Sequence, residues 1–425
     1  MKRTIAASVL LAAGAVAGAL AYNAAAQDRA YRALLDRGDA ALADDQTFDA
    51  IEEYSGAVAI RPDSMLAHLR RGEAYERRND LEAATNDFRI AADLDPTATR
   101  PLEALGDVLY RRGRFRRAAE AYERRLAVDG QAPRIAYKLG LARYRQGNFD
   151  AALAAAGDAI NLDQRLAEGY YLIGLCLRAQ GQLRPAATAF EKVTTLSPGM
   201  LAAREELAAL YGAMGRRADE IEQLQFLAIL ERSRPERQVA VGLAQARAGQ
   251  EELAVLTLGN ALERAPDHPL VFGALGQVWL ARAVEEDDQV FLRKALEALE
   301  RVASTSAAPS EMLAAYGRAL LLDNQLAAAE RILQQASRRY PVHAAALLAY
   351  ADVAERRNHF DAARTAVMEY AALAQNDPAF VAHAITIARL SLRVNDKATA
   401  AVWIGRGLRR DPGNQTLLTL SRRAR

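Results

Sequence analysis

Small, aromatic and proline residues return every 34 positions along this chain, from Tyr31 almost to its C-terminus. The segment 65–98 shows the pattern clearly, with a glycine at its position 8, an aromatic residue at position 24 and a proline at position 32 (Gly72, Phe88 and Pro96). A fixed period of this length indicates stacked copies of one supersecondary unit. Because each unit packs on its neighbours, such an array grows without a single central core.

Three positions of the repeat predict a pair of helices in each unit. Glycine inside a helix costs about 1 kcal/mol relative to alanine, so its recurrence at position 8 predicts a close approach of the second helix. Proline at position 32 ends the second helix, because it lacks the N–H that a continuing helix needs. Residues that tolerate the left-handed conformation at a helix end predict a turn near position 15: Gly113, Gly147, Gly181, Gly215, Gly249, Asn79, Asn358 and Asn395.

This period and these residues resemble the tetratricopeptide repeat (TPR) family. The resemblance implies an all-α fold, a right-handed α-solenoid of about eleven helix-turn-helix units. The eighth and tenth units are longer than the others, and we expect the inserted acidic stretch 285–288 to form an exposed loop between helices. Residues 415–425 are expected to cap the array, with Arg422, Arg423 and Arg425 in water. The units are 31–64, 65–98, 99–132, 133–166, 167–200, 201–234, 235–268, 269–309, 310–343, 344–380 and 381–414.

Residues 1–26 have the three-part plan of a secretory signal peptide, with a basic start, an apolar run and a small-residue site before Gln27. Cleavage at that site is predicted, and an earlier cut after Ala21 stays open. The alternative is an uncleaved membrane anchor, because the apolar run approaches the ~20 residues that span a bilayer. In either case we expect the repeats to be exported to the periplasm, or to face it from an inner-membrane tether.

Composition and motifs argue against several other classes of protein. The net charge is +2, from 55 basic and 53 acidic residues, whereas a general nucleic-acid binder needs a strong basic excess on one face. The single cysteine, Cys176, excludes a disulfide or a thiolate zinc site within one chain. No two histidines have the spacing of a metal-binding helix, and no catalytic constellation is recognisable. We therefore predict no enzyme activity, no catalytic residue, no cofactor and no metal site.

The resemblance also implies where a partner binds. In TPR arrays the first helix of each unit lines a concave face, and its positions 2, 5, 9, 12 and 13 point into the groove. Tyrosine and arginine are enriched in binding hot spots, and they gather at these positions in the third to fifth units. The alternative is that the tyrosines fill gaps between repeats and the arginines only solvate the face. The candidate partner-binding residues are Arg100, Tyr110, Arg111, Arg134, Tyr137, Tyr144, Arg145, Tyr171 and Arg178.

The sequence therefore predicts a non-enzymatic TPR scaffold or adaptor of the bacterial cell envelope. It would bind protein or peptide partners through its groove, in the export or assembly of envelope components. Two alternatives stay open: a polysaccharide-binding component of an exopolysaccharide biosynthesis or export system, and a membrane-anchored regulator of an envelope complex. Contact with a membrane is expected only through the N-terminal segment, if that segment is retained.

Overall fold

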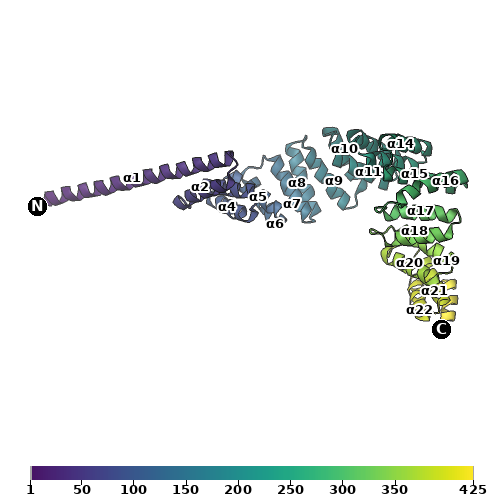
Figure 1. Ribbon diagram of the computed structural model, residues 1–425. Coiled ribbons are helices and arrows are strands. Elements are labelled where there is room, and N and C mark those ends of the chain that lie inside the picture. Colours follow the sequence, from purple (N-terminus) through teal and green to yellow (C-terminus); the bar gives the residue numbers. More distant parts are fainter. Residues whose placement is uncertain (1, 425) are drawn as a thin grey trace. The chain divides into compact units, whose positions relative to one another are not determined.

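The computed structural model describes residues 2–424, and in that range it contains twenty-three α-helices and no strand (Figure 1). Side chains are described from residue 20 onward. The prediction of an all-α repeat protein is confirmed. The chain divides into two units, residues 1–210 and 211–425, and α11 (Leu201–Ala213) contains the boundary between them.

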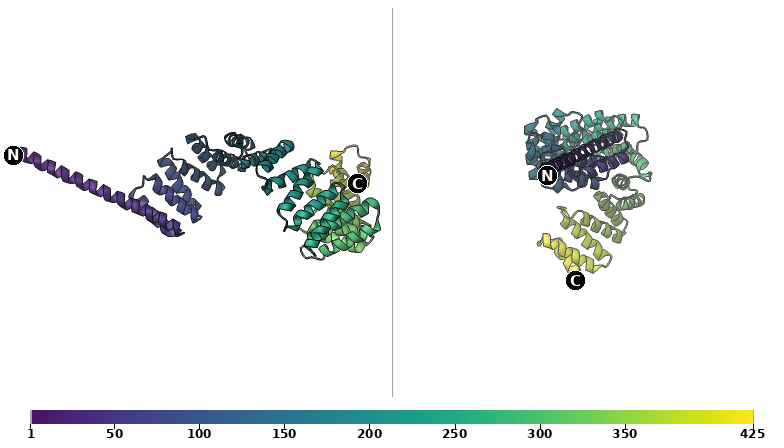
Figure 2. Two further views of the ribbon diagram at one scale, coloured as in Figure 1. Left: turned by 90° about the horizontal axis from the view of Figure 1, so that it is seen from above. Right: turned by 90° about the vertical axis from the view of Figure 1, so that its left-hand side faces the viewer.

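The first unit consists of successive antiparallel helix pairs, seen from two further directions in Figure 2. Its first helix is much longer than the rest, at 42 residues. Its helices are α1 (Lys2–Ala43), α2 (Thr47–Ile60), α3 (Met65–Arg77), α4 (Leu81–Leu94), α5 (Thr99–Arg111), α6 (Phe115–Val128), α7 (Pro133–Arg145), α8 (Phe149–Leu162), α9 (Ala167–Ala179) and α10 (Leu183–Leu196).

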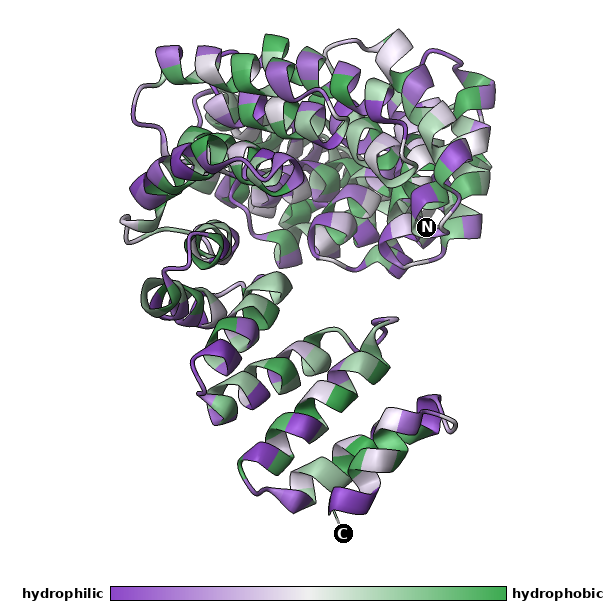
Figure 3. Cartoon of the chain, turned by 90° about the vertical axis from the view of Figure 1, so that its right-hand side faces the viewer, coloured by the Kyte–Doolittle hydropathy of each residue, from purple (hydrophilic) through white to green (hydrophobic). Residues whose placement is uncertain are grey.

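The second unit continues the same alternation of first and second helices. Its helices are α12 (Arg217–Leu230), α13 (Pro235–Arg247), α14 (Glu251–Arg264), α15 (Pro269–Glu286), α16 (Gln289–Ala303), α17 (Ser310–Leu322), α18 (Leu326–Arg338), α19 (Ala344–Arg356), α20 (Phe360–Leu373), α21 (Phe380–Arg393), α22 (Lys397–Arg410) and α23 (Gln415–Ala424). Hydrophobic and hydrophilic residues alternate along these helices in Figure 3, as expected where one face of each helix is buried.

Residues 2–26 of the predicted leader lie within α1 (Figure 1), and Met1 lies outside the described residues. The C-terminal part of the same helix packs into the first hairpin, where Tyr31 and Leu35 are buried against Ile51 and Tyr54 of α2. Among the residues that the structure describes, no helix combines the length and the apolar character needed to cross a bilayer.

Local sequence explains how each hairpin turns. In the second one, the Ser64 hydroxyl caps α3 by accepting from the Ala67 N–H at 3.2 Å, and the Asp80 carboxylate caps α4 by accepting from Ala83 at the same distance. Such caps contribute about 1 kcal/mol each. Between the two helices Asn79 has a φ of 62°. The turn prediction is confirmed throughout, because positive φ occurs at Gly113, Gly147, Gly181, Gly215, Gly249, Asn79, Asn358 and Asn395.

The small residue at position 8 has the packing role that the sequence predicts. A Cβ added to Gly106 would lie 2.4 Å from the Tyr122 ring of the paired helix, which is closer than real contacts allow. Gly140 faces a paired helix with alanine, Ala156, at position 24, and there an added Cβ would lie 3.2 Å from the backbone oxygen of Ala152. Glycine thus lets the second helix approach until its side chain at position 24, or its backbone, touches the first helix.

The acidic insertion of the eighth unit differs from the predicted loop. Helix α15 continues through Glu285 and Glu286, so the connection to α16 is only two residues long. Asp287 takes the left-handed conformation with φ 52°, and the Asp288 carboxylate accepts from the Val290 N–H at 2.6 Å. Glutamate is a good helix former, which explains why the insertion lengthens the helix instead of the turn.

The glutamate at position 20 of the sixth unit also has a structural explanation. Glu220 replaces the small residue at position 20 and is buried, with ion pairs of 2.9 Å to Arg217 and 2.7 Å to Arg247. Gly212 leaves the space for it, because an added Cβ would lie 3.1 Å from the Glu220 carboxyl carbon.

The predicted capping segment forms the last helix, α23, which packs on α21 and α22 through Leu417 and Leu420. Arg422 and Arg423 are exposed, while Arg425 lies outside the described residues.

Candidate functional site

A hollow of about 730 Å³ lies along the first helices of the first three hairpins. It is formed by α1, α3 and α5, and nearly all of the residues that line it occupy positions 2, 9, 12 or 13 of their repeats. Two of the predicted groove residues, Arg100 and Arg111, are brought together here. The charged residues of the lining are Asp39, Arg70, Glu73, Glu76, Arg77, Arg100 and Arg111.

Three of the four arginines of this hollow are paired with carboxylates, and the fourth, Arg77, donates to the Leu42 carbonyl oxygen at 2.6 Å. Arg100 lies 2.6 Å from Glu73 of the preceding repeat. Arg111 lies 2.8 Å from Glu76 and also donates to the Asn79 side chain at 3.0 Å. Arg70 continues the series, at 3.3 Å from Glu73 and 3.6 Å from Asp39. We call this set of pairs between repeats the charge ladder, and it leaves the hollow close to electrical balance.

The ladder continues with a residue that the sequence analysis did not single out. The Lys138 ammonium lies 2.8 Å from Glu103 and 2.7 Å from Asp107 of the preceding repeat. Partial burial favours the neutral amine, but the two carboxylates outweigh it and raise the pKa of Lys138. Asp107 also accepts from the Tyr122 hydroxyl at 2.6 Å. Lys138 occupies position 6, outside the positions carried over from the family, and lysine is rare in this chain.

Four predicted tyrosines lie on α5, α7 and α9, with their rings half-buried. Three contact a phenylalanine ring of the paired helix. The ring centroids are 5.2 Å apart for Tyr110 and Phe115, 5.6 Å for Tyr144 and Phe149, and 5.4 Å for Tyr171 and Phe190. The fourth, Tyr137, packs against the cores of the fourth and fifth hairpins. Three of these tyrosine rings therefore pack within their own hairpin.

The hydroxyl groups of these four tyrosines are different from those of the core. Tyr54 and Tyr122 donate to Asp39 and Asp107, each at 2.6 Å. The hydroxyls of Tyr110, Tyr137, Tyr144 and Tyr171 have no hydrogen-bond partner among the described residues. Partial burial, helped by nearby carboxylates, raises the pKa of Tyr137 and Tyr171, so both remain protonated donors at neutral pH.

Of the other predicted arginines, one forms an ion pair with a carboxylate and two do not, among the described residues. Arg178 forms an ion pair with Glu206. The Arg145 guanidinium lies 5.0 Å from the centroid of the Phe115 ring, on which Tyr110 also packs. Arg134 is exposed and forms no ion pair with any described residue. We call the four tyrosines with Arg134 and Arg145 the tyrosine row.

The second unit has a hollow of its own on first helices, of about 430 Å³. It is formed by α15 and α17 with the start of α19. Leu280, Val284 and Ala314 make much of its lining apolar, and Glu311 and Arg318 are its charged members. No tyrosine lines this hollow, and Arg318 is its one arginine among the described residues.

Two side chains of potentially reactive type, Cys176 and His68, are buried. Cys176 is fully buried, and burial raises the pKa of its thiol to about 11. His68 is also buried, with its ring nitrogens 3.0 Å from Asp87 and from the Pro62 carbonyl oxygen. No cluster of potential metal ligands occurs among the described residues.

The repeat sequence matches a known family model. The tetratricopeptide repeat model matches residues 35–99, 103–167, 137–200 and 323–379, which together make up just over half of the chain. No curated protein sequence matches the chain.

Several solved structures resemble parts of the chain. MamA from Desulfovibrio magneticus RS-1 is 20% identical over 40% of this chain and 96% of that one, with a TM-score of 0.38. PilF from Pseudomonas aeruginosa is 19% identical over 50% and 96%, with a TM-score of 0.39. YrrB, described as a TPR protein with an unusual peptide-binding site, is 21% identical over 42% and 92%, with a TM-score of 0.37. These likenesses concern the fold alone.

Proposed function

The chain belongs to the tetratricopeptide repeat family, and from that premise we propose that it is a non-enzymatic adaptor that binds an extended segment of a partner protein. The tyrosine row is the proposed binding surface. A TPR fold is generally a scaffold for protein interactions, and this chain consists of helical hairpins along nearly all of its described length.

The observation that carries the proposal is that four tyrosine hydroxyls have no hydrogen-bond partner in the part of the chain that the structure describes. Each ring is held by packing, so the position of its hydroxyl is fixed before a ligand arrives. An extended peptide presents backbone N–H and C=O groups at regular spacing, and each needs a hydrogen-bond partner once water is excluded. Tyrosine both donates and accepts, which suits such a backbone whatever its sequence.

The two arginines of the row give the site its preference for charge. Arg134 and Arg145 have no carboxylate partner among the described residues, unlike Arg100, Arg111 and Arg178. They are the guanidinium groups that an acidic side chain of the partner would meet first. The ladder arginines would have to leave an existing carboxylate, so we assign them to positioning the groove walls.

For the cellular location we propose export to the cell envelope. The support is the plan of residues 1–26, with a basic start, an apolar run and a small-residue site. N-terminal sequencing of the protein isolated from the envelope tests this proposal. A mature start at Gln27 or Tyr22 is expected, and an intact Met1 would instead favour the membrane-anchored regulator.

Removal of single oxygen atoms tests the binding surface. The triple variant Tyr137→Phe, Tyr144→Phe and Tyr171→Phe keeps every ring and its packing but removes three unpartnered hydroxyls. Tyr170→Phe, on the same helix as Tyr171, is the matched control. Partner proteins are captured from an envelope lysate by crosslinking and then tested as overlapping synthetic peptides.

We expect the triple variant to bind the best peptide at least about tenfold more weakly, since each neutral hydrogen bond contributes ~0.5–1.5 kcal/mol. The control should bind as the wild type does. Equal binding by all three proteins would contradict the proposed surface. Retention of acidic polysaccharide fragments in place of any peptide would favour the exopolysaccharide alternative.

A further inference from the structure

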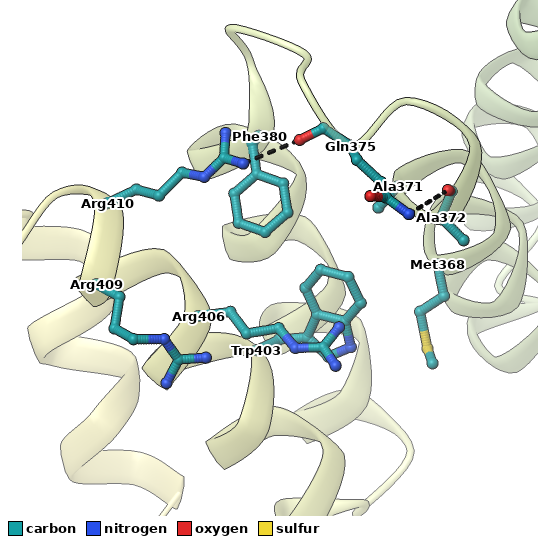
Figure 4. A pocket seen from close by; sticks show the side chains of 9 residues that line it. All are labelled: Met368, Ala371, Ala372, Gln375, Phe380, Trp403, Arg406, Arg409 and Arg410. Atoms are coloured by element: carbon teal, nitrogen blue, oxygen red, sulfur yellow. Dashed lines mark hydrogen bonds between the residues drawn. The ribbon is translucent and has the colours of Figure 1, made fainter.

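A second hollow of a different kind lies near the C-terminus, formed mainly by second helices (Figure 4). It measures about 590 Å³ and lies between α20 and α22, beside the start of α21. Its apolar floor is made by Met368, Phe380 and Trp403, and three arginines of α22 stand at its rim. None of these residues belongs to the groove positions described above.

The three rim arginines form no ion pair with any residue that the structure describes. Arg406 stacks over the Trp403 ring at 4.7 Å, and Arg410 stacks over the Phe380 ring at 4.3 Å while donating to the Gln375 carbonyl oxygen at 2.9 Å. Arg409 has neither a ring nor a carboxylate as partner among the described residues. No acidic residue lines the hollow. Three positive charges therefore surround it, and no described carboxylate is paired with them.

The local charge of the sequence agrees with this arrangement. Residues 381–425 contain nine lysines and arginines but only two aspartates and no glutamate, in a chain whose total net charge is +2. The dipole of α22 favours Arg409 and Arg410 in its last turn. That effect does not explain Arg406, which lies a full turn earlier. It also does not explain why aromatic rings lie beneath Arg406 and Arg410.

The floor is built to receive an apolar side chain. The Phe380 and Trp403 rings lie 6.0 Å apart at 36° to each other, and Trp403 is held by the core of the last hairpins with only 6% of its surface exposed. The volume of about 590 Å³ lies within the range of ligand pockets, ~300–1,000 Å³, so a leucine or aromatic side chain fits with room to spare. Arginines at positions i, i+3 and i+4 of one helix lie on one face, so their guanidinium groups converge on the same opening.

We propose that this hollow, the aromatic–arginine pocket, binds an acidic peptide segment of a partner protein, in which a leucine or aromatic side chain is flanked by carboxylates. The apolar side chain would lie on Phe380 and Trp403, and the carboxylates would pair with Arg406, Arg409 and Arg410. Arginine binds carboxylates through two parallel hydrogen bonds. A recessed aromatic floor favours a peptide over a lipid surface, which would need its basic residues spread across an open face.

A defined peptide tests the pocket in the full-length protein. The probe is a fluorescein-labelled octapeptide with two central leucines flanked by six glutamates. The matched probe has glutamine in place of every glutamate. Binding is measured by fluorescence anisotropy for the wild type, for the variant Arg409→Gln with Arg410→Gln, and for Arg293→Gln, an exposed arginine of α16. In a Trp279→Phe background the fluorescence of Trp403 reports contact with the floor.

The acidic probe is expected to bind the wild type and Arg293→Gln equally and to change the fluorescence of Trp403. Loss of two charge-assisted contacts should weaken binding at least about tenfold in the double variant. Any of three results would overturn the proposal: equal binding of the glutamine probe, unchanged binding by the double variant, or binding of phosphatidylglycerol vesicles but not of the acidic probe. Thermal unfolding of each variant, followed by circular dichroism, checks that the fold is retained.

Discussion

The hollow formed by α1, α3 and α5 and the aromatic–arginine pocket use arginine in opposite ways. In the first, Arg70, Arg100 and Arg111 are paired with Asp39, Glu73 and Glu76 of the preceding repeats. In the second, arginines stack on aromatic rings or extend to solvent with no carboxylate. The same residue type thus joins repeats in one region and remains available to a ligand in the other. The number of basic residues at a surface therefore does not measure its affinity for anions.

The largest expected effect on stability comes from a substitution that displaces Tyr122, which joins the core of its hairpin to the charge ladder through Asp107. In Gly106→Ala the new methyl group would overlap the Tyr122 ring, whose hydroxyl holds Asp107 in place for Lys138. We expect a loss of about 2–3 kcal/mol in the free energy of unfolding, as for overpacked cores. Urea unfolding followed by circular dichroism measures it, and binding at the aromatic–arginine pocket should be unchanged.

Gly405→Ala is the matched substitution in the other region. The nearest atom to its added Cβ is the tip of the Arg409 side chain, at 3.9 Å. Alanine should therefore stabilise α22 by about 0.5–1 kcal/mol through its helix propensity. Equal destabilisation by the two substitutions would show that the close contact of Gly106 with Tyr122 is unimportant.

The next largest expected effect is a difference in how salt weakens peptide binding at the tyrosine row and at the aromatic–arginine pocket. Raising sodium chloride from about 50 to 300 mM shortens the range of electrostatic attraction roughly twofold. We expect the acidic octapeptide to bind the aromatic–arginine pocket about tenfold more weakly at the higher salt, a change of ~1.4 kcal/mol. A peptide bound by the tyrosine row should lose less affinity than this, because hydrogen bonds to neutral hydroxyls contribute there beside the two arginines. If salt weakened both peptides equally, the two surfaces would not differ in how far they depend on charge.

Much of this arrangement could be predicted from the sequence. Turn residues such as Asn79 and Gly113 were predictable because the left-handed conformation depends on the residue itself. The placement of Arg100 and Arg111 in one hollow followed from their repeat positions. The pairing of Lys138 with Glu103 and Asp107 was not predictable, because it depends on how far a side chain reaches across two packed helices.

The aromatic–arginine pocket was missed for a different reason. The repeat pattern assigns ligand contacts to first helices, whereas this hollow is formed mainly by α20 and α22. The basic excess of residues 381–425 was a signal in the sequence. It could not show that the arginines surround an apolar floor, since that depends on Phe380 and Trp403 meeting across a helix pair.

High pH should weaken the ladder and leave the pocket arginines unchanged. Burial, helped by Asp107, raises the pKa of the Tyr122 hydroxyl in the folded protein, and the pKa of Lys138 is also raised. Between about pH 10 and 11 the unfolded chain loses these protons while the folded chain keeps them, so stability falls as pH rises. We expect a loss of about 1 kcal/mol over that interval from Tyr122 alone.

Urea unfolding at pH 9, 10 and 11 measures this loss, and Tyr122→Phe should flatten the dependence. A slope that is unchanged in this variant would mean that other groups govern the response. Arginine stays protonated throughout this range, so the acidic octapeptide should bind the pocket equally at pH 8 and pH 10.

The smallest expected change in stability is the sharpest test of the comparison. Glu73→Gln removes the carboxylate shared by Arg70 and Arg100. Because these pairs are partly exposed, the free energy of unfolding should change by no more than about 0.5 kcal/mol. Binding should respond much more, since two arginines lining the hollow lose their partner.

We expect the Glu73→Gln protein, with its pocket closed to the probe by Arg409→Gln and Arg410→Gln, to bind the acidic octapeptide again at the first hollow. Fluorescence anisotropy against the same protein with Glu73 intact measures the gain. If no binding appears, the absence of a carboxylate partner is insufficient to make an arginine surface bind anions. The apolar floor under Arg406, Arg409 and Arg410 would then be the feature that distinguishes the two regions.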